Sequence, residues 1–259
     1  MRNLNAIVAI AFRDITKLFR DKTRILANFV FPVIFIGVLG GSLQSNLQES
    51  LPYNFLTFVF TGVIAQTLFQ STASGIISLV EDRQNDFAQE LFVSPIPRHS
   101  ILIGKIFGET IVSFIQVSMV ILFGVIIGVP LVFPALMRVL PFFPVVAFMG
   151  GAFGVLVMST LTNQKTASQI FPFLIFPQFF LAGVFNPIKI LPTPILIASR
   201  AMPMTYAVDL VRSIYYAGSS EREFVVLFNT QTNLSVVLGL FLVFLTLGTY
   251  LFVKNEKDK

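Results

Sequence analysis

Long apolar stretches, separated by polar segments, dominate the sequence. A helix needs about 20 mostly apolar residues to cross a bilayer, because each residue adds ~1.5 Å along the helix axis. Six stretches reach this length, so the pattern predicts six transmembrane helices. They cover residues 25–43, 54–80, 101–129, 141–161, 167–185 and 234–253.

The segment that precedes these stretches has a different pattern. Its apolar residues recur at steps of three and four, which places them on one side of a helix, and charged residues populate the other side. This predicts an amphipathic helix on the membrane surface; the alternative is an extension without a partner. A cleaved signal peptide does not fit, since its short charged region leads directly into an apolar run. The apolar set is Leu4, Ile7, Val8, Ala11, Ile15, Leu18 and Phe19, and the charged set is Arg13, Asp14, Lys17, Arg20 and Asp21.

The connection at residues 81–100 is more than a plain loop. Its polar start is compatible with a helix, on which Phe87 and Leu91 share one face, and Pro95 and Pro97 end that helix. A short amphipathic helix with exposed aromatic residues suits docking into a groove on a partner. The alternative is a solvated loop whose Phe residues dip into lipid.

The connection at residues 186–233 is too apolar for a free loop, and its prolines prevent a continuous span. Irregular backbone at membrane depth persists only where protein or water covers it. We therefore expect short re-entrant helices that cap the outer end of the bundle. Tyr206, Asp209 and Arg212 are spaced to share a helix face there. The alternative is an interfacial Tyr beside a surface ion pair.

Composition supports a membrane protein. The chain of 259 residues is 55% hydrophobic and 12% charged, with a mean hydropathy of +0.82, whereas soluble domains carry about 25% charged residues. It has no cysteine and one histidine, His99. This excludes disulfides and thiolate chemistry and leaves no His cluster, so we expect no metal site.

The positions of the basic residues predict the orientation. The net charge of +5 could indicate a nucleic-acid partner, but in a membrane protein Lys and Arg first report the cytoplasmic side. Thirteen of the 18 lie on the side of both termini. We therefore expect cytoplasmic termini and no nucleic-acid partner. The chain is predicted to form one domain, 1–259, with a surface helix (1–24), a six-span bundle (25–253) and a cytoplasmic tail (254–259).

Polar and aromatic residues inside the spans are candidates for a translocation path, because polar groups at membrane depth are costly. The alternatives are interhelical hydrogen bonding for the polar residues, which include Ser71 and Ser74, and lipid contact for the aromatic ones. Lys105 and Glu109, four residues apart at the inner end of the third span, are expected to pair. The path candidates are Gln66, Phe69, Gln70, Gln116, Phe173, Phe176 and Phe180.

Four segments, in order, resemble the membrane subunits of type-2 ABC exporters, particularly the bacterial daunorubicin-resistance-like permeases. Each segment is weak by itself, but their order within a six-span frame is fairly specific, and together they extend over most of the chain. They are the basic N-terminal helix, Glu90-Leu91 … Ser94-Pro95-Ile96-Pro97-Arg98 … Gly104-Lys105, Leu181-Ala182-Gly183-Val184-Phe185-Asn186-Pro187, and Pro203 … Tyr206 … Asp209 … Arg212 … Gly218.

The resemblance implies a permease in the bacterial inner membrane that works as a dimer, with a homodimer favoured over a heterodimer. Each copy would bind a separate ATP-binding subunit, which holds ATP and Mg. The second cytoplasmic loop would be the coupling helix, and the outer helices would form a gate. The coupling residues would be Glu81, Arg83, Asp86, Phe87, Glu90, Leu91, Pro95 and Arg98, and the outer gate Phe185, Pro203, Tyr206, Asp209 and Arg212.

The chain itself is not expected to be an enzyme or to bind a cofactor. A P-loop needs Gly-x-x-x-x-Gly-Lys-Ser/Thr, whereas Gly104-Lys105 is followed by Ile106 and the leading Gly is replaced by His99. With 30 Phe and no Trp, the chain favours a hydrophobic drug, lipid or lipid-linked substrate, as in multidrug efflux, over a polysaccharide. The distant alternatives are a secondary transporter and a membrane-embedded lipid enzyme.

Overall fold

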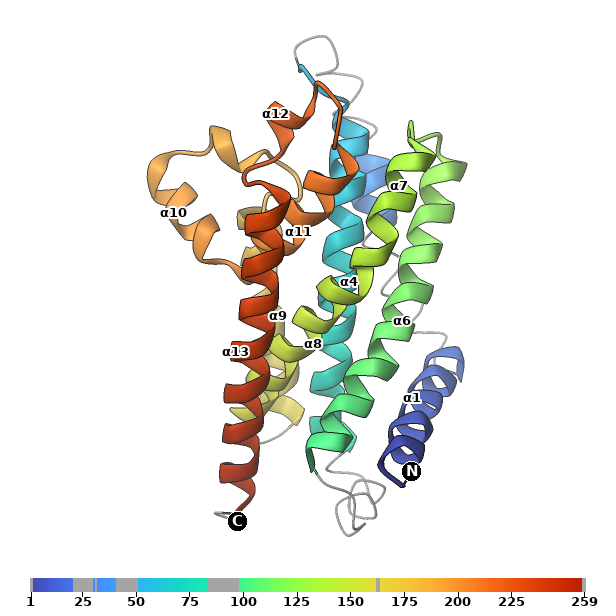
Figure 1. The fold of residues 1–259 in the computed structure, drawn as a ribbon, viewed down its shortest axis with the longest axis vertical. Coiled ribbons are helices and arrows are strands. Elements are labelled where there is room, and N and C mark those ends of the chain that lie inside the picture. Colours follow the sequence, from blue (N-terminus) through green and yellow to red (C-terminus); the bar gives the residue numbers. More distant parts are fainter. Residues whose placement is uncertain are drawn as a thin grey trace.

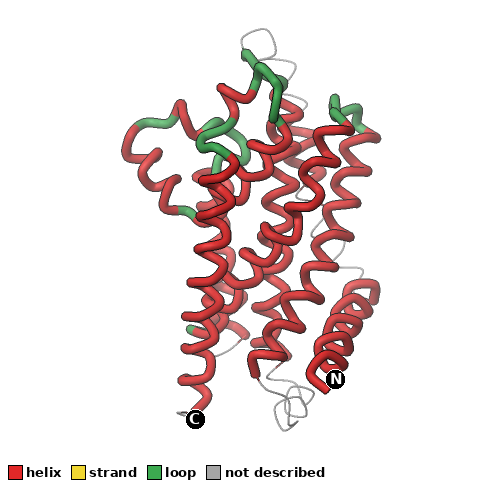
Figure 2. Tube along the Cα trace, viewed as in Figure 1, coloured by secondary structure: helices red, strands yellow, loops and turns green. Residues whose placement is uncertain are grey.

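A computed structural model of the chain describes residues 2–20, 30, 32–40, 51–82, 98–161 and 164–257. Within these ranges the backbone forms helices and loops and no strand (Figure 2), which confirms the predicted all-α class. Four of the described helical stretches are long and apolar enough to cross a membrane. The first helix and the last turns of the final helix lie at the same end of the bundle (Figure 1).

The central helix is α4 (Phe55–Asp82), which corresponds to the predicted second span. Its most apolar window is 89% buried inside the protein, although α4 is the least apolar of the four candidate spans. Two of its buried hydroxyl groups bond to its own backbone: Thr61 donates to the carbonyl of Phe58 at 2.9 Å, and Thr72 to that of Leu68 at 2.6 Å. Most polar residues of α4 therefore face protein, whereas Ser74 is exposed. Its main neighbours are α6 (Arg98–Ile126) and α8 (Phe143–Ser159).

Glycines allow α8 to lie close to α4 on one side and to α13 (Thr230–Lys257) on the other. A Cβ at Gly150 would overlap the backbone of Phe69, and a Cβ at Gly154 would lie 2.7 Å from the carbonyl oxygen of Ala73. A Cβ at Gly248 of α13 would lie 2.8 Å from a backbone nitrogen of α8. Close packing of this kind between spans is typical of small residues four apart. The bundle is thus layered in the order α4, α8, α13 (Figure 1).

The fourth span begins earlier than the sequence pattern predicts. The prediction starts at residue 141, whereas the helical stretch starts at Phe133 and runs to Ser159. Its three segments each carry a proline in the first turn, where the missing N–H costs no helical hydrogen bond. The prolines therefore mark where each segment begins, and the helical stretch continues through them. The segments are α7 (Phe133–Val139), η2 (Leu140–Phe142) and α8.

The remaining spans are described to different extents. The predicted fifth span corresponds to α9 (Gln164–Leu181), an 18-residue helix with Pro172 and Pro177 in its interior, whose apolar part, Gln169–Leu181, is shorter than the four candidate spans. Most of the predicted first span, 25–43, lies outside the described residues, and its described part includes η1 (Val33–Gly40), a π-helical segment that contacts α4 and α6. The count of six spans therefore stays a prediction.

Short helices fill the connection between α9 and α13, as expected, at the end of the bundle opposite α1 (Arg2–Arg20) (Figure 1). One of them, α11, is buried over almost its whole length and packs on α4 and α13, whereas α10 is mostly exposed. Whether they enter a membrane stays a prediction. They are η3 (Ile188–Ile190), α10 (Thr193–Ala201), α11 (Pro203–Tyr215) and α12 (Arg222–Val225).

Helix α1 packs along the N-terminal half of α6 (Figure 1), and its predicted apolar residues lie on one broad side of the helix, of which α6 covers only a part. Ala11 and Leu18 are buried, whereas Val8 and Phe19 are exposed. The side of α1 that packs on α6 is centred near Asp14 and Leu18, so Val8 and Phe19 at the far edge of the apolar side stay uncovered.

Candidate functional site

Three buried charges join α1 to α6; we call Asp14, Lys105 and Glu109 the inner charge cluster. Lys105 Nζ lies 2.8 Å from Asp14 Oδ1 and 2.9 Å from Glu109 Oε1, and the three side chains are at most 1% exposed. The spacing in the sequence indicated the contact between Lys105 and Glu109. Asp14, however, was assigned to the charged outer side of its helix. It instead faces α6 in line with the buried Ile10 and Leu18, one helical turn away on either side.

Two glycines make room for the carboxylates of the inner charge cluster. A Cβ at Gly75 of α4 would overlap the carboxyl group of Glu109. A Cβ at Gly108 would lie 3.0 Å from Asp14 Oδ2 and 2.9 Å from the Cα of Ala11. The cluster thus brings α1, α4 and α6 together at one point. Burial raises the pKa of Asp14, and the ammonium of Lys105 opposes that rise.

At the other end of the bundle, Arg212 of α11 is fully buried beside α4 and the end of α9. Its Nη1 donates to the carbonyl of Gly183 at 2.6 Å, and its Nη2 donates to the carbonyls of Phe58 and Val184 at 3.0 Å each. The guanidinium also lies 3.6 Å from the centroid of the Phe58 ring, a cation–π contact. Burial lowers the pKa of Arg212 to about 10, so it stays protonated at neutral pH.

The chain around Arg212 is shaped to receive it. A Cβ at Gly62 of α4 would lie 2.7 Å from Arg212 Nη2 and 2.9 Å from the carbonyl oxygen of Val184. Gly183 has φ +76°, a left-handed conformation that glycine adopts without strain and that ends α9. Through hydrogen bonds to backbone carbonyls, Arg212 therefore joins α11 to α4 and to the segment that ends α9.

Asp209, one turn before Arg212, binds a different segment. Its Oδ1 accepts the backbone N–H of Leu227, and its Oδ2 accepts the N–H of Phe228 and the side-chain amide of Asn233, all at 2.7 Å. Asp209 therefore fixes the turn that leads into α13. The alternative of a surface ion pair between Asp209 and Arg212 is wrong, because both side chains are buried and each is held by other groups.

The other expected gate residues lie around this core. The Tyr206 hydroxyl donates to the carbonyl of Arg200 at 2.8 Å, and its ring stacks on Phe228 at 5.7 Å between centroids. Pro203 is half-buried in the first turn of α11. Phe185 is half-buried and stacks on Phe35 of η1 at 4.5 Å. The structure thus brings the five gate candidates to one end of the bundle; their gating role stays a prediction.

Helix α9 presents an exposed aromatic face. The side chains of Phe173, Phe176 and Phe180 are 80%, 56% and 52% exposed. The rings of Phe176 and Phe180 are 5.8 Å apart, and Phe180 lies 5.8 Å from Phe185, so the aromatic row continues past the end of α9 to the gate candidates. Residues 169–181 contain no charged side chain.

The path candidates on α4 and α6 are separate from this face and mostly buried. Gln66 is 2% exposed and donates to Gln70 at 3.3 Å, while Phe69 is fully buried and its ring is 5.4 Å from that of Phe153. No described group bonds the buried Gln66 Oε1, Ser71 Oγ or Gln116 Nε2. The expected path residues therefore form two groups in one chain, a buried polar one and an exposed aromatic one.

The expected coupling residues lie largely outside the described residues. Arg83, Asp86, Phe87, Glu90, Leu91 and Pro95 fall in the gap between 82 and 98, and Glu81 and Arg98 mark only the adjoining helix ends. Within the described ranges no three His, Asp or Glu side chains converge in a way that could hold a metal ion.

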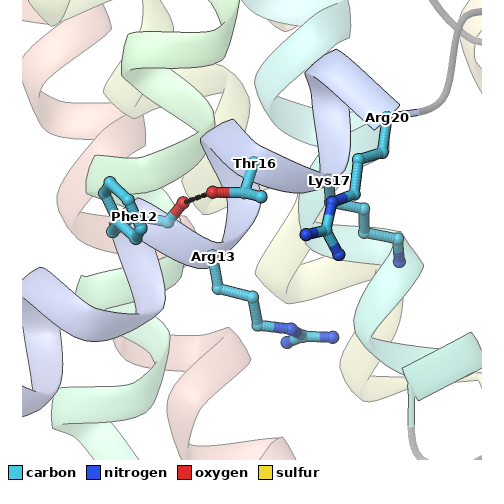
Figure 3. A pocket seen from close by; sticks show the side chains of 5 residues that line it. All are labelled: Phe12, Arg13, Thr16, Lys17 and Arg20. Carbon is cyan, nitrogen blue, oxygen red and sulfur yellow. Dashed lines mark hydrogen bonds between the residues drawn. The ribbon is translucent and has the colours of Figure 1, made fainter.

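An open hollow lies beside α1. The described residues that line it are Phe12, Arg13, Thr16, Lys17 and Arg20 (Figure 3). The sequence analysis assigned its cations to the polar side of the surface helix, and in the structure Arg20 is exposed and Arg13 and Lys17 are half-buried. The hollow itself was not predicted, because it depends on how α1 sits against the bundle.

Sequence reasoning also missed the glycines that receive the buried charges. The signal for α8 was present, since Gly150 and Gly154 have the spacing of a close-packed membrane helix pair. Gly62 and Gly75 carry no such signal, because their partners come from distant segments.

Comparisons with known proteins agree with this architecture. The family model described as "ABC-2 type transporter" matches residues 5–216. The chain is similar to "Putative transport permease ycf38" of Cyanophora paradoxa, with 27% identity over 251 residues that cover 92% of this chain and 84% of that protein. It is also similar to "Putative transport permease YvfS" of Bacillus subtilis (strain 168), with 20% identity over 268 residues that cover 98% and 99%.

Proposed function

The chain belongs to the ABC-2 type transporter family, and from this premise we propose that it is the membrane-spanning subunit of an ATP-driven exporter. It moves a hydrophobic drug, lipid or lipid-linked compound out of the cytoplasm or the inner leaflet. It resides in the bacterial inner membrane, with several spans and both termini in the cytoplasm. The observation that carries the choice of substrate is the exposed, uncharged aromatic face of α9.

ATP is hydrolysed by a separate ATP-binding subunit, which also holds Mg. This chain has no Gly-x-x-x-x-Gly-Lys-Ser/Thr sequence to cradle phosphates. The segment from 81 to 98 is the coupling element that rests on this partner, and α1 lies at the end of the bundle where α4 ends and α6 begins (Figure 1). The inner charge cluster then connects α1 to α6 and α4, so a displacement of α1 is passed to the spans.

Two identical copies assemble through α9 and the neighbouring part of α4. An uncharged face with three Phe side chains more than half exposed can pack on its own copy, and it leaves an apolar lining at the seam. The buried amide groups of Gln66 and Gln116 supply polar contacts nearby. The outer helices, fixed by Asp209 and Arg212, form the outer gate of this path.

A cysteine scan of α9 tests the assembly. The chain lacks cysteine, so a single Phe173→Cys substitution gives an unambiguous cross-link. Oxidation in membranes should yield a covalent dimer if two copies meet there, since Cα atoms must come within about 7 Å. Leu242→Cys, on the exposed side of α13, is the matched control and should stay monomeric. The reverse pattern would move the seam to α13.

A second experiment tests the ATP-binding partner and the substrate class. Tagged protein is purified from native membranes in mild detergent and assayed for a stoichiometric ATP-binding subunit, which Phe87→Ala with Glu90→Ala should release. In reconstituted vesicles, the triple variant Phe173→Ala, Phe176→Ala and Phe180→Ala should lose export of a hydrophobic dye. The control variant Leu238→Ala with Leu242→Ala and Leu247→Ala, three exposed apolar residues of α13, should retain it. A stable protein without an ATPase would reopen the secondary-transporter and lipid-enzyme alternatives.

Export of a polysaccharide is the second candidate within the same family. Sugar rings usually stack on Trp or Tyr, and this chain has no Trp and 5 Tyr. The exposed face of α9 also offers a glycan few hydrogen-bonding groups. The vesicle assay distinguishes the two, because a glycan exporter would not move the dye.

A further inference from the structure

Helix α1 has three distinct sides. One side packs on α6 and carries Ile10, Asp14 and Leu18. A second side is apolar yet exposed: the side chains of Val8, Phe12 and Phe19 are 60%, 71% and 58% exposed. The third side is cationic, with Arg13, Lys17 and Arg20 on successive turns.

The cationic side borders an open hollow of about 670 Å³, lined by Phe12, Arg13, Thr16, Lys17 and Arg20. Figure 3 shows the three cationic side chains extending from neighbouring turns, with the Phe12 ring on another side of the helix. The Thr16 hydroxyl donates a hydrogen bond to the backbone carbonyl of Phe12 at 2.8 Å. The positive groups are thus the main polar feature of the hollow, and an apolar stripe lies next to it.

We propose that this hollow binds the headgroup of an anionic phospholipid. The phosphate lies among Arg13, Lys17 and Arg20, and the acyl chains run along Val8, Phe12 and Phe19. Guanidinium and ammonium groups form short, charge-assisted hydrogen bonds with phosphate oxygens. Arg13 and Lys17 have other interactions as well, but a guanidinium has five N–H donors and an ammonium three.

A lipid fits both features of α1 at once, which favours it over an acidic protein surface. A protein partner would satisfy the cations but would leave an exposed stripe of Val and Phe beside them without a role. A phospholipid has its charge and its apolar chains in the same molecule, and amphipathic helices with basic faces bind anionic membranes in this way. Helix α1 lies along the N-terminal half of α6 (Figure 1), and in the proposed orientation this puts the hollow at the headgroup level of the inner leaflet.

Lipid binding at this site should stabilise the whole bundle against unfolding. The opposite side of α1 is tied to α6 by the inner charge cluster, so a lipid held on α1 restrains the inner end of the spans. Ligand that binds only the folded protein raises its unfolding temperature. This consequence does not depend on an ATPase partner or on the transported substrate.

The test uses the full chain in detergent, with dioctanoyl phosphatidylglycerol and dioctanoyl phosphatidylcholine as probes. Native mass spectrometry gives the affinities, and thermal unfolding gives the stabilisation. We expect phosphatidylglycerol to bind more tightly, with an affinity that falls as salt rises. Each cation near an anionic headgroup contributes about fivefold, so Arg13→Gln with Lys17→Gln and Arg20→Gln should weaken phosphatidylglycerol binding about 100-fold.

The matched control neutralises three exposed cations elsewhere, with Arg138→Gln, Lys189→Gln and Lys254→Gln. This control loses as much positive charge as the test variant but keeps the cations of α1. If the site is local, the control should therefore bind phosphatidylglycerol as tightly as the wild type. A separate variant, Phe12→Gln with Phe19→Gln, should weaken both lipids and leave their ratio unchanged. Unfolding curves without lipid check that each variant is folded.

Three results would overturn the proposal. The first is equal affinity for the two lipids in the unmodified protein. The second is an equal loss in the test and control variants, which would indicate a response to net charge alone. The third is normal lipid binding by the test variant together with loss of a copurifying ATP-binding subunit, which would assign the cationic side to a protein partner and would leave the proposed exporter function intact.

Discussion

Substitution Lys105→Met should destabilise the protein more than any other single change in the inner charge cluster. It removes the one cation between two carboxylates, and the three side chains are at most 1% exposed. Removing one partner of a buried ion pair costs about 3–5 kcal/mol, because the remaining charge is left unpaired in a medium of low polarity. Asp14→Asn should cost less, about 1.5–3 kcal/mol, since Lys105 keeps Glu109 at 2.9 Å.

The loss should also depend on pH. Burial already raises the pKa of Asp14, and Lys105 is the largest opposing cause. In Lys105→Met the folded-state pKa of Asp14 rises further above its unfolded value. A carboxyl group with a raised folded pKa favours folding below its unfolded pKa, and this contribution is lost as pH rises through the folded pKa. The variant should therefore lose more stability at pH 8 than at pH 5.

Unfolding in mixed micelles, followed by far-UV circular dichroism against the fraction of denaturing detergent, measures both effects. Lys254→Met, an exposed lysine near the end of α13, is the control and should be near neutral. The combination Asp14→Asn, Lys105→Met and Glu109→Gln should recover most of the loss, because no charge is left buried. A loss below about 1 kcal/mol for Lys105→Met would refute the view that the three charges are shielded from water and that the two carboxylates depend on Lys105.

The remaining predictions concern the outer core and α4. Gly62→Ala should destabilise by about 1–3 kcal/mol through overlap with Arg212, whereas Gly239→Ala, in open space on α13, should stabilise by about 0.5–1 kcal/mol; the same unfolding assay ranks them. Arg212→Leu should cost about 2–5 kcal/mol and reduce export, because three carbonyls lose a charged donor; an unchanged export rate would exclude a gating role. Asp209→Ala should cost more than Asp209→Asn, which keeps one acceptor for the turn before α13, and hydrogen exchange at residues 227 and 228 would report the difference.

Much of the architecture follows from local pattern alone. Spans two, three and six are long apolar runs whose helices lie close to the predicted bounds, and the i, i+4 spacing of Lys105 and Glu109 was enough to anticipate their contact. The third member, Asp14, is 91 residues from Lys105, and nothing local distinguishes it from an aspartate that faces water. Its one signal was its position in line with Ile10 and Leu18, which becomes meaningful only once α6 is known to cover that side.

The outer end was predicted less well for a related reason. The spacing of Asp209 and Arg212 correctly indicated a shared helix, but spacing cannot tell burial from exposure. Apart from the side-chain amide of Asn233, their hydrogen-bond partners are backbone groups of α4, of the segment just after α9 and of the turn before α13, which carry no side-chain signal in the sequence. Tertiary packing, rather than pairing within α11, therefore decides what each charge does.

The two glycines of α4 that receive charges restrict how this helix can move. Gly62 and Gly75 are 13 positions apart, which is about 20 Å along the axis and about 140° around it at 3.6 residues per turn. Arg212 enters the first gap and Glu109 the second, from different sides. Rotation of α4 about its own axis is therefore blocked, because Arg212 or Glu109 would collide with the side chains that flank its glycine. A displacement of α4 must therefore carry α11, which holds Arg212, and α6, which holds Glu109 and is joined to α1 through Lys105 and Asp14.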